Sequence, residues 1–487
     1  MGWRGPLLAF ASLLLYGGSA AWTLWSRGYA YFYGDAEAHL NIARRIFDSR
    51  TPGPEQIGTV WLPLPHVLLA MFARNDAWWV SGLAGVVPGV LCFALAGALL
   101  YAAARRTLGP GAGLAAALLF AANPNLLYLQ STAMTEPVMA AALAALLCAT
   151  LRYRDQQSVW TLLVLAAASN AASLTRYEGW FLIPFLTIFV WITARNKQHA
   201  YLFALLASAA PVAWFAHNIF YYGDALAFYN GPYSARAILQ RQLGEGMVQP
   251  AAGNWSLSAL YYAQAARDVV GDPLLIVAGL GSVAALFKRA WWPLLLLVLP
   301  GAFYIWSIHS SGTPVFVPEL DPYTRYNTRY ALALLPLAAF AGAALLALLP
   351  ERVRTGAAIT LVLGVAFGHY RAGVPISWEE ARVGSEARRE WTAQAAAYLK
   401  DNYRSGAGIV FWFGDLAPVF RAAGIPFREG LYQDNGSLWD PALFPQEKWA
   451  LAQEGDPVDK AVRGKFNVVQ RIEVKGAPAV LIYRRIQ

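Results

Sequence analysis

The 487-residue chain has few charged residues and few cysteines. Charged side chains make up 14% of it, whereas an ordinary globular chain carries about 25%. Hydrophobic residues reach 57%. This balance argues against a soluble domain and predicts a multi-span membrane protein. The two cysteines, Cys92 and Cys148, lie inside apolar runs. We expect them to be buried packing residues, so they provide no disulfide framework.

Several motifs are also missing. The sequence contains no G-x-x-x-x-G-K-[ST] phosphate loop and no dinucleotide fingerprint, and its six histidines are dispersed without H-E-x-x-H spacing. The net charge of +9 comes from basic residues scattered in pairs between apolar runs. That distribution is typical of membrane orientation signals and not of nucleic-acid binding. The sequence therefore shows no nucleotide site and argues against nucleic acid as a partner.

Long apolar runs predict about eleven transmembrane helices, since a span needs roughly 20 apolar residues. Residues 6–26 could instead be a cleaved signal peptide, but this run is as long as a span and many spans follow, which favours an uncleaved first helix. The segment 60–73 is also apolar. The predicted spans are 5–26, 78–104, 112–128, 133–151, 158–174, 179–194, 199–218, 270–287, 290–308, 329–349 and 355–370.

Basic residues in the short loops predict the orientation of these spans. With Met1 in the cytoplasm, alternate connections each hold a basic pair, apart from the short start with Arg4. The opposite face then carries the long loops 27–77, 219–269 and 309–328 together with the C-terminal tail. The pairs are Arg105 and Arg106; Arg152 and Arg154; Arg195 and Lys197; Lys288 and Arg289; and Arg352 and Arg354.

The tail differs in pattern from the rest of the chain. We predict a transmembrane domain over 1–370 and a small α/β domain outside the membrane over 375–487, which is an ordinary domain size. Trp391, Ala395, Tyr398 and Leu399 recur at helical spacing. The predicted helices are 379–403 and 416–423, and the predicted strands are 409–413, 466–469 and 479–483.

The first outer loop carries Asp35, Glu37 and His39 within five residues. Charged groups beside a membrane need water, partners or a function. The following residues predict an amphipathic helix lying on the membrane surface. Asp35 lies at its start, where the helix dipole favours an anion, and the alternative is that Asp35 only caps this helix. The apolar side is Leu40, Ala43, Ile46 and Phe47, and the charged side is Arg44, Arg45 and Asp48.

Two short outer turns carry further ionisable residues. Glu136 precedes Pro137 at the start of a span, where it either caps the helix or contacts an acceptor or a loop arginine. Arg176 and Glu178 lie in the turn after residue 174. They form either a local ion pair or a phosphate site, because the planar guanidinium suits phosphate oxygens.

A fourth segment, 321–330, contains Arg325-Tyr326 and Arg329-Tyr330 just before an apolar run. Tyrosine and arginine are common anchors at a membrane interface. The alternative is that these side chains contact a lipid phosphate or a sugar.

Topology and motifs together resemble the C-type (GT-C) glycosyltransferases, and most closely the bacterial family that includes aminoarabinose transferases and protein O-mannosyltransferases. That family has one span followed by an outer loop with the pattern D-E-x-x-x-x-x-I-A-R. Asp35 matches its first acid and residues 42–44 its I-A-R. The second acid is replaced by Ala36, and Glu37 follows one position later. The proline-bearing segment 61–66 and the Arg329-Tyr330 pair also match, so the resemblance covers roughly residues 1–350.

The resemblance implies an inverting transfer of a sugar from a polyprenyl-phosphate donor at the outer face of a bacterial-type inner membrane. It makes Asp35, with Glu37, the catalytic candidate. The acceptor is a lipid, a glycan or a protein. No cofactor is firmly predicted, and a divalent metal at Asp35, Glu37 and His39 is an alternative. Candidate donor-binding residues are Arg176, Glu178, Arg325, Arg329 and Tyr330, and candidate acceptor-binding or orienting residues are Glu136, His39 and His66.

Three other functions use similar features. A transporter or flippase should show ionisable residues in the middle of its spans and matching broken helices in two halves. Here the ionisable residues cluster at the outer ends, and no inverted repeat is visible. A lipid-linked polymer ligase or polymerase shares the carrier chemistry. The protein could also be a non-enzymatic scaffold that presents the tail. In that case substituting Asp35 should have no effect on function.

Overall fold

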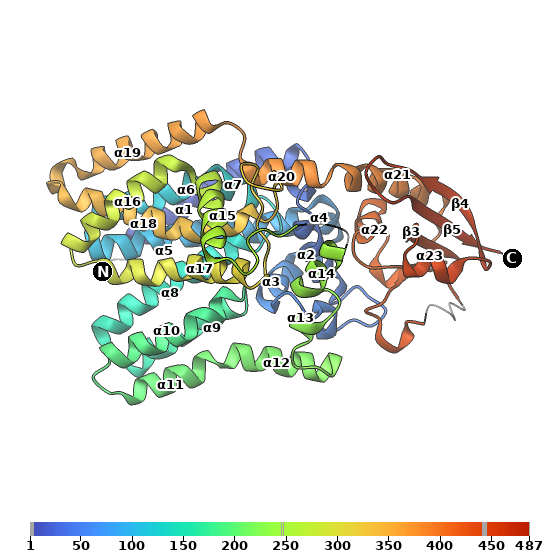
Figure 1. The fold of residues 1–487 in the computed structure, drawn as a ribbon, viewed down its shortest axis with the longest axis horizontal. Coiled ribbons are helices and arrows are strands. Elements are labelled where there is room, and N and C mark those ends of the chain that lie inside the picture. Colours follow the sequence, from blue (N-terminus) through green and yellow to red (C-terminus); the bar gives the residue numbers. More distant parts are fainter. Residues whose placement is uncertain (1–3, 245, 247, 441–445, 487) are drawn as a thin grey trace. The chain divides into compact units, whose positions relative to one another are not determined.

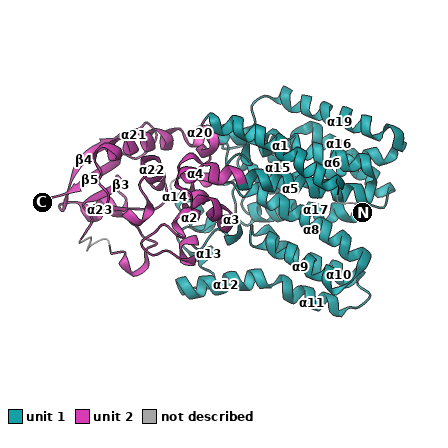
Figure 2. Ribbon diagram, turned by 180° about the vertical axis from the view of Figure 1, so that it is seen from behind, with its two compact units in different colours: residues 1–27, 59–65, 88–380 teal, residues 28–58, 66–87, 381–487 magenta. Residues whose placement is uncertain are grey.

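Figure 1 shows the computed structural model of the chain, which describes residues 4–244, 246, 248–440 and 446–486. The chain divides into two compact units (Figure 2). Unit 1 comprises residues 1–27, 59–65 and 88–380. Unit 2 comprises residues 28–58, 66–87 and 381–487, so most of the loop predicted over 27–77 belongs with the tail. The predicted division at 370–375 stays a prediction.

Unit 1 consists mainly of helices that run alongside one another (Figure 1). Each of the eleven predicted spans is largely helical, and how many cross a membrane stays a prediction. Among the described residues, eight helical segments are long and apolar enough to span, and four more apolar helices are 10–17 residues long. The eight segments are Arg4–Ser26, Leu83–Leu108, Glu136–Gln156, Gln198–Tyr222, Trp255–Phe287, Trp291–His309, Thr328–Leu348 and Glu351–Gly384.

Local sequence signals set the helix ends in unit 1. Asn123 caps α7 by accepting a hydrogen bond from the Leu126 amide at 2.9 Å, and Pro124 follows at the first helical position. Ser158 and Thr161 form a reciprocal capping box on α9. Gly223 ends α12 in the left-handed region, with φ 73°.

The helices of unit 1 are α1 (Arg4–Ser26), α6 (Pro110–Ala121), α7 (Pro124–Leu129), α8 (Glu136–Gln156), α9 (Val159–Ser173), α10 (Glu178–Thr193), α11 (Gln198–Ala207), α12 (Ala209–Tyr222), α13 (Ala227–Asn230), α14 (Ala235–Gly244), α15 (Trp255–Ala266), the π-helical turn η3 (Arg267–Gly271), α16 (Asp272–Phe287), α17 (Trp291–His309), the 3₁₀ helix η4 (Thr328–Leu334), α18 (Leu335–Ala344), η5 (Leu345–Leu348) and α19 (Glu351–Ala372). Helices α3 (Pro63–Ala73), α5 (Leu83–Leu108) and α20 (Ile376–Gly384) contain residues of both units.

Glycine allows α16 and α18 to pack at close range. A Cβ atom on Gly281 would lie 1.9 Å from the Ala341 carbonyl oxygen. Small residues at such contacts let membrane helices approach until their backbones touch. The two cysteines are free, and both are half-buried in their helices where the sequence predicted buried packing residues.

A five-stranded mixed sheet forms the centre of the tail in unit 2. The strand order is β2-β1-β3-β5-β4, with β1 parallel to β2 and β3, and β5 antiparallel to β3 and β4. Its apolar core includes Val410, Leu431, Val458 and Leu481. The strands are β1 (Ile409–Phe411), β2 (Gly430–Leu431), β3 (Trp449–Gln453), β4 (Phe466–Ile472) and β5 (Val480–Arg485).

Three of these strands lie where the sequence predicted them. The other two were missed because β2 has only two residues and β3 contains two alanines, which are depleted in strands.

The predicted helix 379–403 is interrupted between α20 and α21. The other helices of unit 2 are η1 (Tyr29–Tyr31), α2 (Gly34–Arg45), η2 (Pro54–Ile57), α4 (Asp76–Ser81), α21 (Glu386–Asn402), α22 (Ala417–Ala423), η6 (Phe427–Glu429), η7 (Gly436–Leu438) and α23 (Pro457–Val462).

Helix α2 forms as predicted, but its charged side is buried and not solvated. Arg44, Arg45 and Asp48 are all less than 5% exposed. Arg44 pairs with Asp48 at 2.7 Å, and Arg45 pairs with Asp434 of the tail at 2.5 Å. Pairing offsets part of the desolvation cost of burying such charges. The helix therefore packs within unit 2 along its charged side.

Candidate functional site

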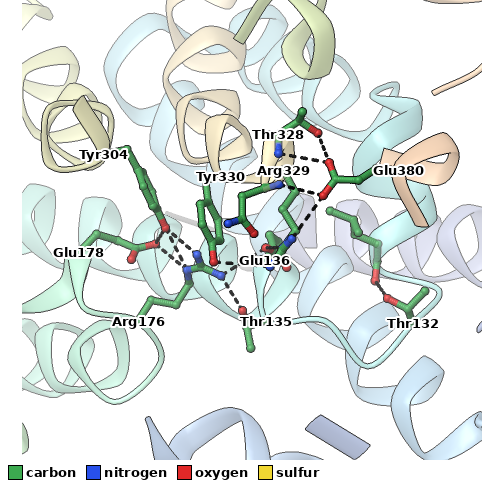
Figure 3. Close-up of polar contacts among 12 residues, drawn as sticks. Thr132, Thr135, Glu136, Arg176, Glu178, Tyr304, Thr328, Arg329, Tyr330 and Glu380 are labelled. Carbon is green, nitrogen blue, oxygen red and sulfur yellow. Dashed lines mark hydrogen bonds and ion pairs between the residues drawn. The ribbon is translucent and has the colours of Figure 1, made fainter. Parts of the chain in front are cut away.

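Arg176 lies at the centre of a polar cluster in unit 1 (Figure 3). Its Nε donates to Glu178 Oε1 at 2.9 Å, and its Nη1 donates to Thr135 Oγ1 at 2.7 Å and to Glu136 Oε1 at 3.2 Å. Its Nη2 donates to the Tyr304 hydroxyl at 2.7 Å. The guanidinium is thus held by four side chains that come from three separate parts of the chain.

Arg329 joins the same cluster through Glu136. Its Nε donates to Glu136 Oε1 at 3.1 Å, so a single carboxylate oxygen accepts from both arginines (Figure 3). Nη1 of Arg329 lies 3.7 Å from Glu380 Oε1. The Tyr330 ring lies beside both guanidinium groups, each with its central carbon 4.7 Å from the ring centroid. Such contacts favour a cation over an aromatic face.

Five elements position these side chains. Glu136 begins α8, Arg176 and Glu178 lie at the turn into α10, Tyr304 is on α17, Arg329 is on η4 and Glu380 is on α20. The turn that carries Arg176 is held by the short segment 59–65. The Leu64 amide donates to the Leu174 carbonyl at 2.9 Å, and the Tyr177 hydroxyl donates to the Val60 carbonyl at 2.7 Å.

Glu380 fixes the start of η4. It accepts from the Thr328 hydroxyl at 2.6 Å (Figure 3). It also accepts from the Asn327 amide at 2.9 Å. The Asn-Pro-Asn motif at 123–125 has a comparable structural role. Asn123 and Asn125 both donate to the Val269 carbonyl, in the π-helical turn, at 2.7 and 3.1 Å.

The cluster borders a cavity of about 20 Å³, which has room for roughly one water molecule. Glu136, Arg176 and Arg329 form part of its wall, and the remaining wall is largely apolar, with Leu143 and Pro336 among its residues. Glu136 is 8% exposed, and its second oxygen, Oε2, accepts no hydrogen bond from the described residues. A buried carboxylate oxygen in this state favours a bound hydrogen-bond donor.

The charges of the cluster almost balance. Two arginines face the carboxylates of Glu136, Glu178 and Glu380, which leaves a formal charge of −1. Burial works against the charge of Arg176, but Tyr304 and the nearby carboxylates raise its pKa well above the usual range. Arg176 is therefore charged at any physiological pH.

Unit 2 contains the other candidates. Asp35 is the second residue of α2 and is half-buried. Glu37 is 4% exposed and lies against two arginines of the tail. Arg421 donates to Glu37 Oε1 through Nε at 3.0 Å and Nη2 at 2.6 Å, and Arg388 Nε lies 3.5 Å from Glu37 Oε2. Asp35 and Glu37 thus occupy different surroundings on one helix.

The two predicted histidines form a buried pair in unit 2. His39 Nδ1 and His66 Nε2 are 3.0 Å apart. In this hydrogen bond one ring nitrogen must donate and the other must accept. At least one of the two rings is therefore not doubly protonated in this arrangement. Within the described ranges, no group of three His, Cys, Asp or Glu side chains is placed to hold a metal ion. Glu37 is held by two arginines, and the metal alternative at Asp35, Glu37 and His39 stays a prediction.

The predicted residues thus fall into three sets, of which one, with Asp35, Glu37, His39 and His66, belongs to unit 2. Arg176, Glu178, Glu136, Arg329 and Tyr330 come together in unit 1 (Figure 3). In contrast Arg325 is exposed, and no ion pair ties it to them in the part of the chain that the structure describes. Sequence reasoning missed Thr135, Tyr304, Glu380, Arg388 and Arg421. Tyr304 lies in an apolar run and the tail arginines lie more than 300 residues from α2, so no local pattern marks them.

Comparisons with known protein families and solved structures show which proteins this chain is similar to. Residues 76–217 match the family described as dolichyl-phosphate-mannose-protein mannosyltransferase. The fold is similar to the crystal structure of ArnT from Cupriavidus metallidurans bound to undecaprenyl phosphate, at 12% identity over 97% of this chain and 98% of that one, with a TM-score of 0.62. It is also similar to the apo oligosaccharyltransferase of Archaeoglobus fulgidus, at 11% identity over 98% and 74% of the two chains, with a TM-score of 0.51.

None of the curated proteins matches the chain in sequence. The family match over residues 76–217 and the fold shared with ArnT both agree with the predicted resemblance to the GT-C membrane glycosyltransferases. The small C-terminal sheet domain is confirmed as well.

Proposed function

We propose that the protein transfers a sugar from a polyprenyl-phosphate donor to an acceptor at the outer face of a bacterial inner membrane, with inversion at the anomeric carbon. The observation that carries this proposal is a pair of arginines, the half-buried Arg176 and the buried Arg329, at a cavity with mainly apolar walls. The cavity has room for roughly one water molecule, so a lipid phosphate head would bind these arginines only by displacing the carboxylates that hold them. The ArnT structure of similar fold contains undecaprenyl phosphate, which supports a carrier of this kind.

Arg176 and Arg329 have the chemistry to neutralise the departing phosphate. Preorganised donors stabilise charge that grows in a transition state without needing to reorganise. Both guanidinium groups are held by carboxylates and by Tyr330, so their positions are set before a ligand arrives. A phosphate would compete with these carboxylates for the same N–H groups.

Asp35 is the proposed base. It takes the proton of the acceptor while the acceptor attacks the anomeric carbon, and the bond from that carbon to the phosphate oxygen breaks. The electron pair leaves with the polyprenyl phosphate. A base must come within hydrogen-bond reach of the proton that it removes. Glu37, engaged by two arginines, is assigned a positioning role in this proposal.

The proposed orientation places the N-terminus in the cytoplasm and the tail, 375–487, outside it. Its basis is the run of basic pairs in alternate connections. A cysteine-accessibility experiment on intact cells tests it: a single cysteine at Ser437, in a variant lacking Cys92 and Cys148, should react with a membrane-impermeant maleimide, and one at Thr107 should not.

The activity test uses purified protein in lipid nanodiscs with a panel of undecaprenyl-phosphate sugars and a bacterial membrane extract as acceptor source. The measured product is undecaprenyl phosphate. Wild-type protein should release it from at least one sugar donor, and Asp35→Asn should release it about 10³-fold more slowly, in the range lost with a general base. Asp401→Asn, on α21, is the matched control and should keep wild-type turnover. Full turnover by Asp35→Asn would refute the assignment of the base.

A further inference from the structure

Arginines of the tail surround the segment that leads into α2. Three of them, Arg388, Arg389 and Arg421, contact residues 31–37, and all of these residues belong to unit 2. Helix α22, which carries Arg421, packs against α2, and α21 packs against α22 (Figure 1). The turn that bears Asp35 is therefore enclosed by side chains that come from the far end of the chain.

Arg421 makes the most extensive of these contacts. Its guanidinium lies 3.4 Å from the centre of the Tyr31 ring and donates twice to Glu37 Oε1. A third bond runs from Nη1 to the Val80 carbonyl at 3.1 Å. The Tyr31 hydroxyl in turn donates to the Trp79 carbonyl at 2.6 Å. One side chain thus ties together the residues on both sides of Asp35 and the end of α4.

Arg388 holds the backbone just before Asp35. Its Nη2 donates to the carbonyl oxygens of Tyr31 and Phe32 at 3.2 and 3.1 Å. Gly34 leaves space for it, because a Cβ there would lie 2.5 Å from Arg388 Nη1. Arg389 lies over the Phe32 ring at 3.9 Å.

We propose that Arg388 and Arg421 are positioning residues for the reaction: the tail acts as a clamp that fixes the first turn of α2, and with it Asp35, through the Glu37 carboxylate and the Tyr31 and Phe32 carbonyls. This clamp rests on the proposed function, in which Asp35 is the base. Displacing a catalytic group by about 1 Å can cost about 100-fold in rate, so a clamp of this kind acts on turnover more than on donor binding.

The test measures turnover and amide hydrogen exchange in the full-length protein. Arg421→Gln removes both bonds to Glu37 and the cation over Tyr31. It should lower kcat about 10- to 100-fold while KM for the donor changes less than about threefold. Amides of residues 31–41 should exchange faster, because the turn is less constrained. Arg421→Lys keeps the charge and should restore part of kcat.

Arg471→Gln is the matched control. It also removes ion pairs of a tail arginine, with Glu454 and Glu473, but these pairs lie on the sheet and not on α2. Gly34→Ala supplies a second variant that keeps every charge and only displaces the Arg388 guanidinium. It should raise exchange in residues 31–41 and lower kcat, even if Arg421→Gln does not fold.

Unchanged exchange in these variants, or faster exchange with kcat within about twofold of wild type, would overturn the clamp. Failure of the proposed function looks different. In that case Asp35→Asn keeps wild-type turnover. If the clamp alone fails, Asp35→Asn is still slowed about 10³-fold, whereas Arg421→Gln keeps wild-type turnover.

Discussion

Replacing Arg176 and Glu178 separately distinguishes a phosphate site from a local ion pair. Arg176 donates hydrogen bonds to Thr135, Glu136, Glu178 and Tyr304. Breaking a buried pair by removing one partner costs about 3–5 kcal/mol, so Arg176→Met and Glu178→Gln should both lower the unfolding temperature. Stability alone therefore cannot separate the two roles, and binding has to be measured.

Only the arginine variant should weaken ligand binding. A hydrogen bond to a charged group contributes about 1.5–3 kcal/mol, and about 1.4 kcal/mol is a factor of ten. Arg176→Met should therefore weaken binding of undecaprenyl phosphate about 10- to 100-fold. Glu178→Gln keeps the guanidinium, removes a competing carboxylate and changes the formal charge of the cluster from −1 to 0. Binding should stay the same or become tighter.

The assay is titration of undecaprenyl phosphate against each purified variant in nanodiscs, followed by native mass spectrometry, with unfolding temperatures measured on the same samples. An affinity of Arg176→Met within about twofold of wild type would refute a phosphate role for this side chain. Equal weakening by Glu178→Gln would mean that the ion pair, and not the guanidinium, matters.

Three further predictions concern stability and the donor site. Gly281→Ala should sharply lower the unfolding temperature, because its Cβ would meet the Ala341 carbonyl, while Gly279→Ala, with open space around it, should not. The hydrogen bond from Arg463, aided by Tyr483, lowers the pKa of Asp459 to about 2. Because this lies below the usual value of about 3.9, the charged carboxylate stabilises the fold above about pH 4, and the effect fades as the pH falls toward 2. Asp459→Asn should thus unfold at a lower temperature than wild type at pH 7, and calorimetry should show the gap closing below about pH 4. Finally, Arg325→Ala should leave undecaprenyl phosphate binding unchanged, since Arg325 is exposed, whereas Arg329→Ala should weaken it; equal losses in the titration would contradict this difference.

Part of the site was predictable because its signals are local. Arg176 and Glu178 are two residues apart, Glu136 precedes a proline at a helix start, and Arg329-Tyr330 adjoins an apolar run. The type of each residue limits the chemistry that its side chain can perform. Each of these residues also lies at the end of a predicted span. What each side chain contacts was not predictable. Glu136 had a capping role as its alternative, and the structure shows instead its bonds to two arginines.

The first outer loop illustrates the limits of periodicity. Helical spacing correctly predicted α2, but the same pattern suggested a solvated charged side. That side is buried because residues of the tail cover it: Asp434 pairs with Arg45, the Phe413 ring lies against the Arg45 guanidinium, and the Phe427 amide donates to Asp48. Periodicity reports which residues share a face and carries no information on what covers that face.

The sequence by itself determined that this is a polytopic membrane protein, where its apolar helices lie, and which polar segments lie at their ends, because hydrophobicity and helix periodicity are properties of neighbouring residues. Only the tertiary structure decided which charges meet. The joining of Glu136 with Arg176 and Arg329, and of Glu37 with Arg388 and Arg421, depends on contacts between residues 40 to 384 positions apart. No local pattern encodes such pairings, since they follow from how the helices pack.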